Sequence, residues 1–389
     1  MVRRMRILHT SDWHIGRSFH GNATLEALAG VLGAIVDQVD EHGVDVVVVA
    51  GDVFDSATPA AGAYTLLTDV LRRIREAGAH VVMTSGNHDS AARLGFQAPF
   101  LGAAGVHVVT DPASIGDPIT IRGVDFYGIP YLEPALVRGV WPEAGVRTQE
   151  QAVRHAMGLV NAARAGRDRP SVAIAHCFAA GVEPTPQLER EVRADLRQGS
   201  LDVVPLADLA GPSYVALGHI HGRAVLEDRV RYSGAPLHYS FGEGSKPRGS
   251  WLVDIDDDGF VDAQWLGLPV PRPLVTLRGT LAELLEDPAH DAHTESWVCA
   301  VLTDRVPQPD PMRRLQARFP FCAAIQHDPA GAGDEPRRSY RERVGRAAPD
   351  QQIVGDFLDF VRRGEGASGD ERALIAEVIG ERRAAEQTA

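Results

Sequence analysis

The sequence predicts an α/β protein in which two packed β-sheets lie between layers of helices. Three observations predict this fold class. β-branched runs alternate with helical apolar spacing before residue 90, a strand-rich region follows, and short polar motifs stand where several predicted strands end. With 389 residues, 44% of them hydrophobic, the chain can bury a large core and form two or three domains.

The first part of the chain alternates strands with helices. A short strand is expected at residues 6–10, and residues 24–41 carry apolar side chains at helical spacing. Residues 44–50 form an almost unbroken β-branched run, which is typical of a strand covered on both faces. A second helix ends before Gly78, and residues 80–84 form the third strand.

The region after residue 105 is richer in strands. Three later apolar runs are expected in a second sheet, at 214–217, 230–233 and 251–255. The remaining predictions are a helix at 149–164 and strands at 106–109, 119–121, 124–129 and 171–175.

Prolines at positions 269, 271 and 273 predict a domain boundary. We therefore expect a first domain at 1–268 and a small α/β capping domain at 269–330. A Gly-, Pro- and Arg-rich linker would occupy 331–349, and a helical tail 350–389. Within the small domain, strands are expected at 274–277, 297–302 and 321–326, and helices at 281–286 and 312–318.

The tail contains two amphipathic segments. Residues 353–363 and 370–383 each carry an apolar stripe at helical spacing. Periodicity alone leaves two interpretations open. The helical hairpin either packs back on its own domain or binds another chain.

Composition excludes several classes of protein. No apolar segment approaches the roughly 20 residues of a membrane span, so the cytoplasm is the expected location. Cys177, Cys299 and Cys322 are scattered, which argues against a disulfide framework and against a cysteine zinc site. The formal net charge of −13 predicts that any strong affinity for DNA is local or comes from a partner.

Five short polar motifs occur along the chain, most of them directly after an apolar run. Each is common by itself, because Asp-x-His occurs by chance and Gly-Asp is ordinary turn chemistry. Together they predict a binuclear metal site, in which two divalent ions about 3.5–4 Å apart can bridge a phosphate. The motifs are Asp12-Trp13-His14, Gly51-Asp52-Val53-Phe54-Asp55, Gly86-Asn87-His88-Asp89, Ala175-His176 and Gly218-His219-Ile220-His221.

The candidate ligands are of mixed oxygen and nitrogen type. Such a set suits Mn²⁺ or Fe²⁺ better than Mg²⁺ alone or Ca²⁺. Asp52, at the end of the most buried predicted strand, is the natural bridge between two ions. The oxygen donors are Asp12, Asp52 and Asn87, and the nitrogen donors are His14, His176, His219 and His221.

His88 has a different expected role. It follows Asn87 directly, so its ring lies near the site without having to bind metal. A protonated imidazole there can stabilise developing charge or protonate the leaving oxygen. Asp55 is expected to orient that imidazole, and Asp89 is expected to be a turn or capping residue.

These residues resemble the calcineurin-like metallophosphoesterases, whose motifs are D-x-H, GD-x-x-D, GNH-D/E, H and GH-x-H. Residues 8–16, 214–222 and 231–237 further resemble the SbcD nuclease subunits of bacterial SbcCD complexes, and the likeness covers essentially the whole chain. The resemblance implies a two-sheet αββα sandwich. It also implies one ion held by Asp12, His14, Asp52 and His221, a second held by Asp52, Asn87, His176 and His219, and His88 as the catalytic imidazole.

The resemblance carries further implications for activity and partners. It implies Mn²⁺-dependent exonuclease action on double-stranded DNA ends and endonuclease action at hairpins or blocked ends, in DNA recombination, repair and replication near the nucleoid. It implies a homodimer and an SbcC-type ATPase partner, whose coiled coil would dock on residues 350–385. A small-substrate phosphatase or cyclic-nucleotide phosphodiesterase is the alternative, although such an enzyme would not need the length beyond Pro269.

Overall fold

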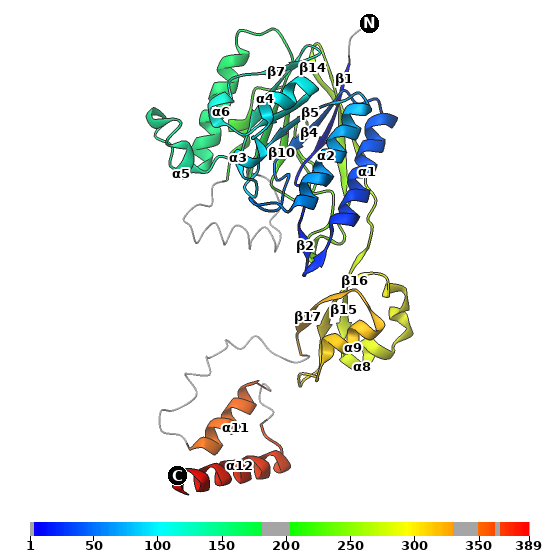
Figure 1. Ribbon diagram of the computed structural model, residues 1–389, viewed down its shortest axis with the longest axis vertical. Coiled ribbons are helices and arrows are strands. Elements are labelled where there is room, and N and C mark those ends of the chain that lie inside the picture. The colour runs from blue at the N-terminus through cyan, green and yellow to red at the C-terminus, as the bar shows by residue number, and fades with distance from the viewer. Residues whose placement is uncertain (1–3, 181–202, 330–348, 362–365, 389) are drawn as a thin grey trace. The chain divides into compact units, whose positions relative to one another are not determined.

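The structure is a computed structural model, which describes residues 4–180, 203–329, 349–361 and 366–388. The chain divides into two compact units, Met1–Pro273 and Leu274–Ala389 (Figure 1). The first unit carries every predicted metal ligand. The Arg-rich segment predicted as a linker lies outside the described residues, apart from Pro349.

The first sheet of the larger unit has six strands in the order β14-β13-β1-β4-β5-β6. β1, β4, β5 and β6 run parallel, whereas β13 and β14 run antiparallel to their neighbours. The strands are β1 (Met5–Thr10), β4 (Val46–Ala50), β5 (His80–Thr84), β6 (Val106–Val109), β13 (Gly249–Asp256) and β14 (Gly259–Gly267).

The second sheet also has six strands, in the order β11-β12-β10-β9-β8-β7. Its four central strands are parallel, and an antiparallel strand stands at each edge. The strands are β7 (Ile119–Ile121), β8 (Val124–Ile129), β9 (Ser171–His176), β10 (Tyr214–Gly218), β11 (Ala224–Glu227) and β12 (Val230–Tyr232).

One strand assignment from the sequence was wrong. The run at 251–255 was expected in the second sheet, but β13 pairs antiparallel with β1 in the first, with Ile7 opposite Val253. Most of its residues are buried, which fits a strand in either sheet, since pattern alone does not identify a neighbouring strand. β14, which the sequence analysis did not predict, completes this edge of the first sheet.

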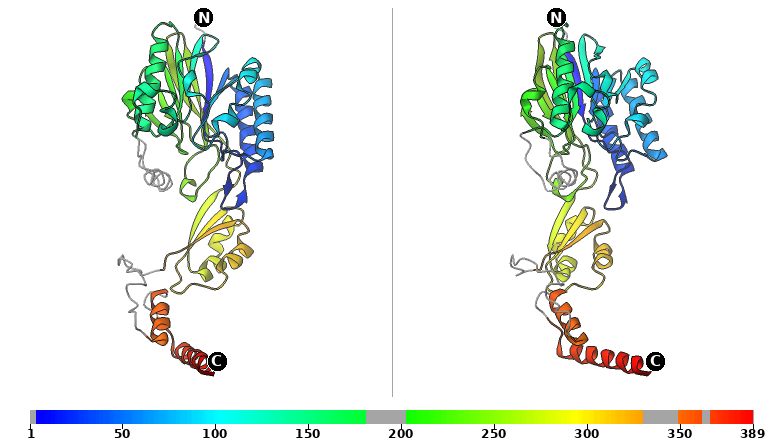
Figure 2. Two further views of the ribbon diagram at one scale, coloured as in Figure 1. Left: turned by 60° about the vertical axis from the view of Figure 1, so that its left-hand side comes forward. Right: turned by 90° about the vertical axis from the view of Figure 1, so that its left-hand side faces the viewer.

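Helices cover the outer face of each sheet, as Figure 2 shows edge-on. The first sheet packs on α1 and α2, and the second sheet packs on α6. The predicted α/β arrangement of two sheets between helices is therefore confirmed. Among the described residues, the α-helices of this unit are α1 (Leu25–Glu41), α2 (Ala61–Glu76), α3 (Ala91–Leu94), α4 (Ala98–Leu101), α5 (Pro134–Val137) and α6 (Gln149–Arg164).

A third apolar layer lies between the two sheets. Val46, Val48 and Ala50 of β4 pack there with Ile174 of β9 and Ala216 of β10. β4 therefore buries both faces, because Val47 and Val49 pack against the outer helices. This explains why its sequence is an unbroken apolar run.

His9 joins the sheets through polar contacts inside this layer. Its Nδ1 lies 2.9 Å from the Tyr214 hydroxyl, and its Nε2 lies 3.1 Å from the carbonyl oxygen of Leu217. The ring is fully buried, and both nitrogens have partners when it is neutral. Its role is structural, as is usual for a lone histidine.

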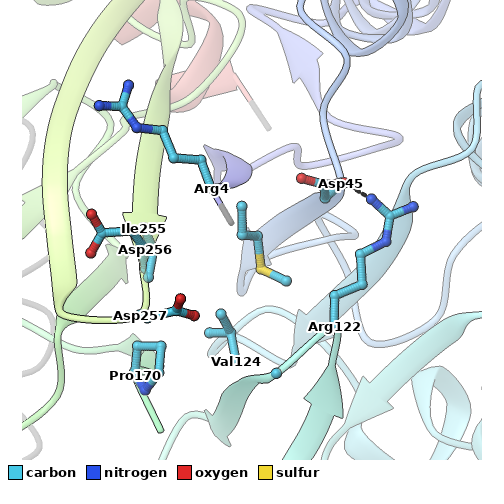
Figure 3. Close-up of a pocket in the computed structure, with 10 residues that line it drawn as sticks. Arg4, Asp45, Arg122, Val124, Pro170, Ile255, Asp256 and Asp257 are labelled. Atoms are coloured by element: carbon cyan, nitrogen blue, oxygen red, sulfur yellow. Dashed lines mark ion pairs between the residues drawn. The ribbon is translucent and has the colours of Figure 1, made fainter. Parts of the chain in front are cut away.

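A small cavity lies at the edge where the parallel strands begin. It measures about 30 Å³ and is lined in part by Arg4, Asp45 and Arg122 (Figure 3). Two of these lining residues, Arg122 and Asp45, form an ion pair with each other. Such a volume suits a water molecule rather than a substrate.

The second unit contains a parallel three-stranded sheet in the order β15-β16-β17. Its core includes Leu277, Leu284, Ala300 and Leu315. α11 (Asp350–Val361) and α12 (Gly369–Thr388) follow and contact each other. The remaining elements are β15 (Leu274–Gly279), α8 (Leu281–Glu286), β16 (Trp297–Leu302), α9 (Pro311–Arg318) and β17 (Cys322–His327). Within the described ranges, no helix combines the length and apolar character that a bilayer crossing needs.

The buried His9 predicts a loss of stability in acid. Burial lowers the pKa of His9 from 6.5 to about 3, so between these pH values the unfolded chain binds a proton that the folded protein does not. The free energy of unfolding should therefore fall as the pH drops below 6.5, by up to about 1.4 kcal/mol per pH unit from this residue. Urea unfolding at several pH values would measure it, with His9→Gln as the comparison. Equal pH dependence in both proteins would contradict the prediction.

Candidate metal centre

The predicted ligands follow parallel strands and meet at one edge of the sandwich. Asp12 and His14 come after β1, Asp52 after β4 and Asn87 after β5 of the first sheet. From the second sheet, His176 ends β9, while His219 and His221 follow β10. Since the carboxyl ends of parallel strands lie at the same edge of a sheet, two packed sheets present two facing rows of side chains.

A first group of ligands surrounds His14. Asp12, His14 and His221 place ligand atoms within 4.8 Å of one another. His14 Nε2 lies 3.1 Å from His221 Nε2 and 3.6 Å from Asp52 Oδ2. Asp12 and His14 are fully buried.

A second group shares Asp52. Its Oδ2 lies 3.4 Å from His176 Nε2. Asn87 Oδ1 lies 3.0 Å from that same nitrogen and 3.2 Å from His219 Nδ1. The structure thus brings all seven predicted ligands together and puts one oxygen of Asp52 between the two groups.

The charges in this cluster fit divalent cations. Burial by itself raises the pKa of Asp52, but His176 and His14 outweigh it and hold that pKa well below its usual range. Burial lowers the pKa of His176, and Asp52 reverses the effect, raising it to about 9. The site therefore keeps its carboxylate ionised and draws positive charge toward it. Carboxylate, amide and imidazole donors in this mixture match Mn²⁺, Fe²⁺ or Zn²⁺.

Several ligands have strained backbones. Asp12, His14, Asp52 and His219 have φ angles of 53°, 45°, 49° and 99°, in the left-handed region that favours glycine. Among the described residues, only three other non-glycine positions have positive φ. Such strain persists where the surrounding structure over-determines it, which is common at functional sites.

Two glycines permit the close approach of the sheets at this edge. A side chain at Gly218 would collide with the carbonyl oxygen of Ala50 on the facing sheet. A side chain at Gly51, whose φ is 78°, would collide with the ring of His176. The glycines beside the ligands are therefore needed for packing as well as for turns.

His88 lies beside the ligands, but Asp55 contacts it differently from the expectation. The carboxylate of Asp55 was expected to orient His88, whereas the backbone carbonyl of Asp55 lies 3.0 Å from His88 Nδ1. The carboxylate instead faces His14, with Oδ1 at 3.3 Å from Nδ1, and Arg17, with Nη1 at 3.4 Å. The rings of His14 and His88 are 4.8 Å apart, edge to face.

Asp89 ties two ligand loops together. Its carboxylate accepts hydrogen bonds from the backbone N–H groups of Val53, Phe54 and Gly86, at 3.0, 2.8 and 2.9 Å. This agrees with the expected turn role. It also holds the loop of Asp52 against the loop of Asn87.

Sequence reasoning missed a pair of charged residues behind His221. Glu243 Oε1 lies 3.4 Å from His221 Nδ1, and Glu243 Oε2 accepts a hydrogen bond of 2.7 Å from Arg248 Nη2. No metal-ligand pattern marks either residue. The one sequence feature that could have drawn attention to Glu243 and Arg248 is their position shortly after residues 231–237, which resemble the nuclease family.

Residues 5–223, more than half of the chain, match the family described as Calcineurin-like phosphoesterase. The chain belongs to the calcineurin-like phosphoesterase family. Family membership indicates a hydrolase that acts on phosphoesters, and the Asp and His cluster is suited to divalent metal ions.

A second match covers residues 270–360 of this calcineurin-like phosphoesterase. It is to the family SbcD_C, described as Type 5 capsule protein repressor C-terminal domain. This segment contains the small sheet of the second unit and most of α11.

Two solved structures are similar to this phosphoesterase at low identity. A dimetal phosphatase from Danio rerio is 14% identical, with a TM-score of 0.36, covering 68% of this chain and 99% of the other. GAP50, the anchor in the inner membrane complex of Plasmodium, is 11% identical, with a TM-score of 0.36, covering 84% of this chain and 98% of the other.

The close sheet contact predicts that Gly218 tolerates no side chain. Gly218→Ala should lower the free energy of unfolding by about 1–3 kcal/mol, because the new methyl group meets a backbone carbonyl that cannot move away. Chemical denaturation would measure the change. Gly30→Ala is the matched control. Gly30 is at an exposed position of α1, its new methyl group would meet nothing within 4 Å, and the change should stabilise by up to about 1 kcal/mol. A neutral Gly218→Ala would contradict the packing argument.

Proposed function

We propose that this chain is the nuclease subunit of a DNA end-processing complex of the SbcD type. It would act as a double-strand exonuclease and as an endonuclease at hairpins or blocked ends. One observation carries the proposal: a phosphoesterase unit with a complete candidate ligand set is joined to a second unit that matches SbcD_C. A phosphatase for small substrates would need only the first unit.

The ligand geometry supports two cation sites that share Asp52. Asp12, His14 and His221 would hold one ion together with Asp52, and Asn87, His176 and His219 would hold the other with it. Two ions there, most suitably Mn²⁺, would lower the pKa of water and neutralise the charge of an in-line displacement at phosphorus.

His88 would handle a proton at the phosphodiester. Its Nδ1 faces the carbonyl of Asp55, which fixes that nitrogen as the donor and directs the ring. Nε2 is then the atom that meets a substrate oxygen. In the protonated ring it can stabilise the developing charge and deliver a proton to the leaving 3′ or 5′ oxygen.

Exposed apolar side chains on the tail helices support the proposal that the tail binds a partner protein. Phe357 on α11 leaves 49% of its surface exposed, and Leu374 and Val378 on α12 leave 61% and 55% exposed. Helices with exposed apolar side chains bind grooves or other helices. We propose that residues 350–385 bind the coiled coil of an SbcC-type ATPase, which would supply much of the DNA affinity that a chain of net charge −13 lacks.

An apolar surface on the first unit supports the proposed homodimer. Phe96 and Phe100 expose 77% and 80% of their surfaces, and Tyr64 exposes 39%. Beside them, Leu67 and Leu101 help to line a cavity of about 730 Å³. A two-fold interface uses the same patch on both copies, and we propose that the protruding rings of each copy enter the apolar hollow of the other.

DNA cleavage tests the proposed function directly. With Mn²⁺, and with the ATPase partner added, the protein should degrade end-labelled linear duplexes and open DNA hairpins. A small diester such as bis-(4-nitrophenyl) phosphate should be a poorer substrate. Rapid turnover of the small diester with DNA left intact would favour the alternative phosphodiesterase or phosphatase.

Two substitutions separate proton handling from metal binding. His88→Ala should retain both ions and lose roughly 10²–10⁴-fold in kcat, because it removes only the proton donor. Asp52→Asn should lose metal, since the shared ligand loses its charge. Metal content by mass spectrometry and steady-state rates would be compared with His290→Ala, a control in the second unit. Equal metal loss in both site variants would contradict the role of His88.

The dimer surface predicts the effect of a polar substitution. Phe96→Ser combined with Phe100→Ser should convert the protein to monomers, because both rings lose the apolar contact. Light scattering after size-exclusion chromatography would measure the mass. Val225→Ser, at another exposed apolar position, is the control. A wild-type monomer, or a double variant that remains dimeric, would contradict this interface.

A further inference from the structure

A buried ion pair outside every predicted motif stands directly behind His221. Glu243 and Arg248 expose only 5% and 3% of their surfaces, and Glu243 Oε2 lies 2.7 Å from Arg248 Nη2. Burying two charges costs desolvation energy, which their mutual attraction often fails to repay. The pair therefore needs an explanation other than stability.

The two charged groups hold His221 from both of its sides. Glu243 Oε1 is 3.4 Å from the ring nitrogen Nδ1 of His221. Arg248 Nη1 donates a hydrogen bond to the backbone carbonyl of His221, which also accepts one of 3.1 Å from the N–H of Ala235. The pair thus fixes both the ring and the main chain of a single candidate ligand.

The carboxylate of Glu243 is fully engaged by its surroundings. It accepts hydrogen bonds from the backbone N–H of Tyr239, at 3.2 Å, and from Ser240 Oγ, at 3.0 Å. Tyr239 in turn donates to the carbonyl of Trp13, at 2.6 Å, in the loop that carries the neighbouring ligands. Because both oxygens of the Glu243 carboxylate have partners, the carboxylate is held in one orientation, which suits a group that must aim another side chain.

The contact decides which nitrogen of His221 faces the metal centre. A proton on Nδ1 points at the Glu243 carboxylate, so the lone pair of Nε2 is left on the side of His14, 3.1 Å from its Nε2. Histidines that bind metals usually donate their other N–H to a carboxylate or carbonyl in this way. The contact with Glu243 therefore orients the lone pair of His221 Nε2 toward the candidate metal site before an ion binds.

We propose that Glu243 and Arg248 are positioning residues for the cation bound by Asp12, His14 and His221. Glu243 fixes the tautomer and aim of His221, and Arg248 keeps the carboxylate and the His221 main chain in place. The inference rests on the proposed metal site. It predicts that one of the two ions depends on this pair, whereas the ion held by Asn87, His176 and His219 does not.

Metal binding tests the inference without relying on activity. Isothermal titration of the full chain with Mn²⁺ alone should resolve two sites in the wild type. Glu243→Gln should weaken one of them by roughly 10–100-fold and leave the other unchanged. Glu227→Gln, on exposed β11, is the matched control and should bind both ions as the wild type does.

A double variant separates positioning from folding. Glu243→Met with Arg248→Met replaces the buried charges by apolar side chains of similar length, which often maintains or raises stability. The folded double variant should still bind one ion weakly, because no carboxylate aims His221. Wild-type affinity at both sites in either variant would overturn the inference while leaving the proposed function intact. A wild-type protein that binds no divalent ion would overturn both.

Discussion

The hydrogen bond between His176 and the carbonyl of Ala50 is the contact on which the site depends. It is 2.9 Å long and joins the end of β9 in one sheet to the end of β4 in the other. Asp52 follows Ala50 by two residues, so this contact brings a carboxylate of one sheet to an imidazole of the other. The absence of a side chain at Gly51 and Gly218 permits that approach, because a Cβ atom at either position would collide with His176 or Ala50.

The sequence predicted which side chains lie together in the candidate site because the candidate ligands follow strands directly. Asp12, Asp52 and Asn87 each stand within three residues of a strand end, and parallel strands carry such residues to one edge. The sequence was a poorer guide where contacts depend on orientation. The side chain of Asp55 turns toward His14 and Arg17 instead of His88. All three of these neighbours lie more than 30 residues away in the chain, so local sequence does not predict which of them the carboxylate contacts.

Long-range pairing limited the prediction of the fold in the same way. The apolar run that forms β13 marks it as a strand, but its partner, β1, lies more than 200 residues earlier. The Glu243–Arg248 pair was hidden for a related reason: polar residues at ordinary spacing become informative only when both are found buried together. Local sequence patterns predict individual helices and strands, whereas the contacts of the folded chain determine which strands and side chains lie next to each other.

The strain in the ligand loops indicates that the protein arranges its donors in advance. Left-handed backbones at non-glycine residues cost roughly 1–3 kcal/mol each in such sites. They persist at Asp12 and His14 because the backbone N–H groups of these residues donate to the carbonyls of Gly51 and Asp52, at 3.1 and 2.9 Å. The N–H of His219 likewise donates to Asp12 Oδ1, at 3.0 Å. These bonds join loops that follow different strands, and one of them joins the two sheets. They stabilise the strained backbone, so one loop cannot relax without the others. Ligands held in this manner need little rearrangement when cations bind, and that preorganisation is what a charge-stabilising phosphoesterase site requires.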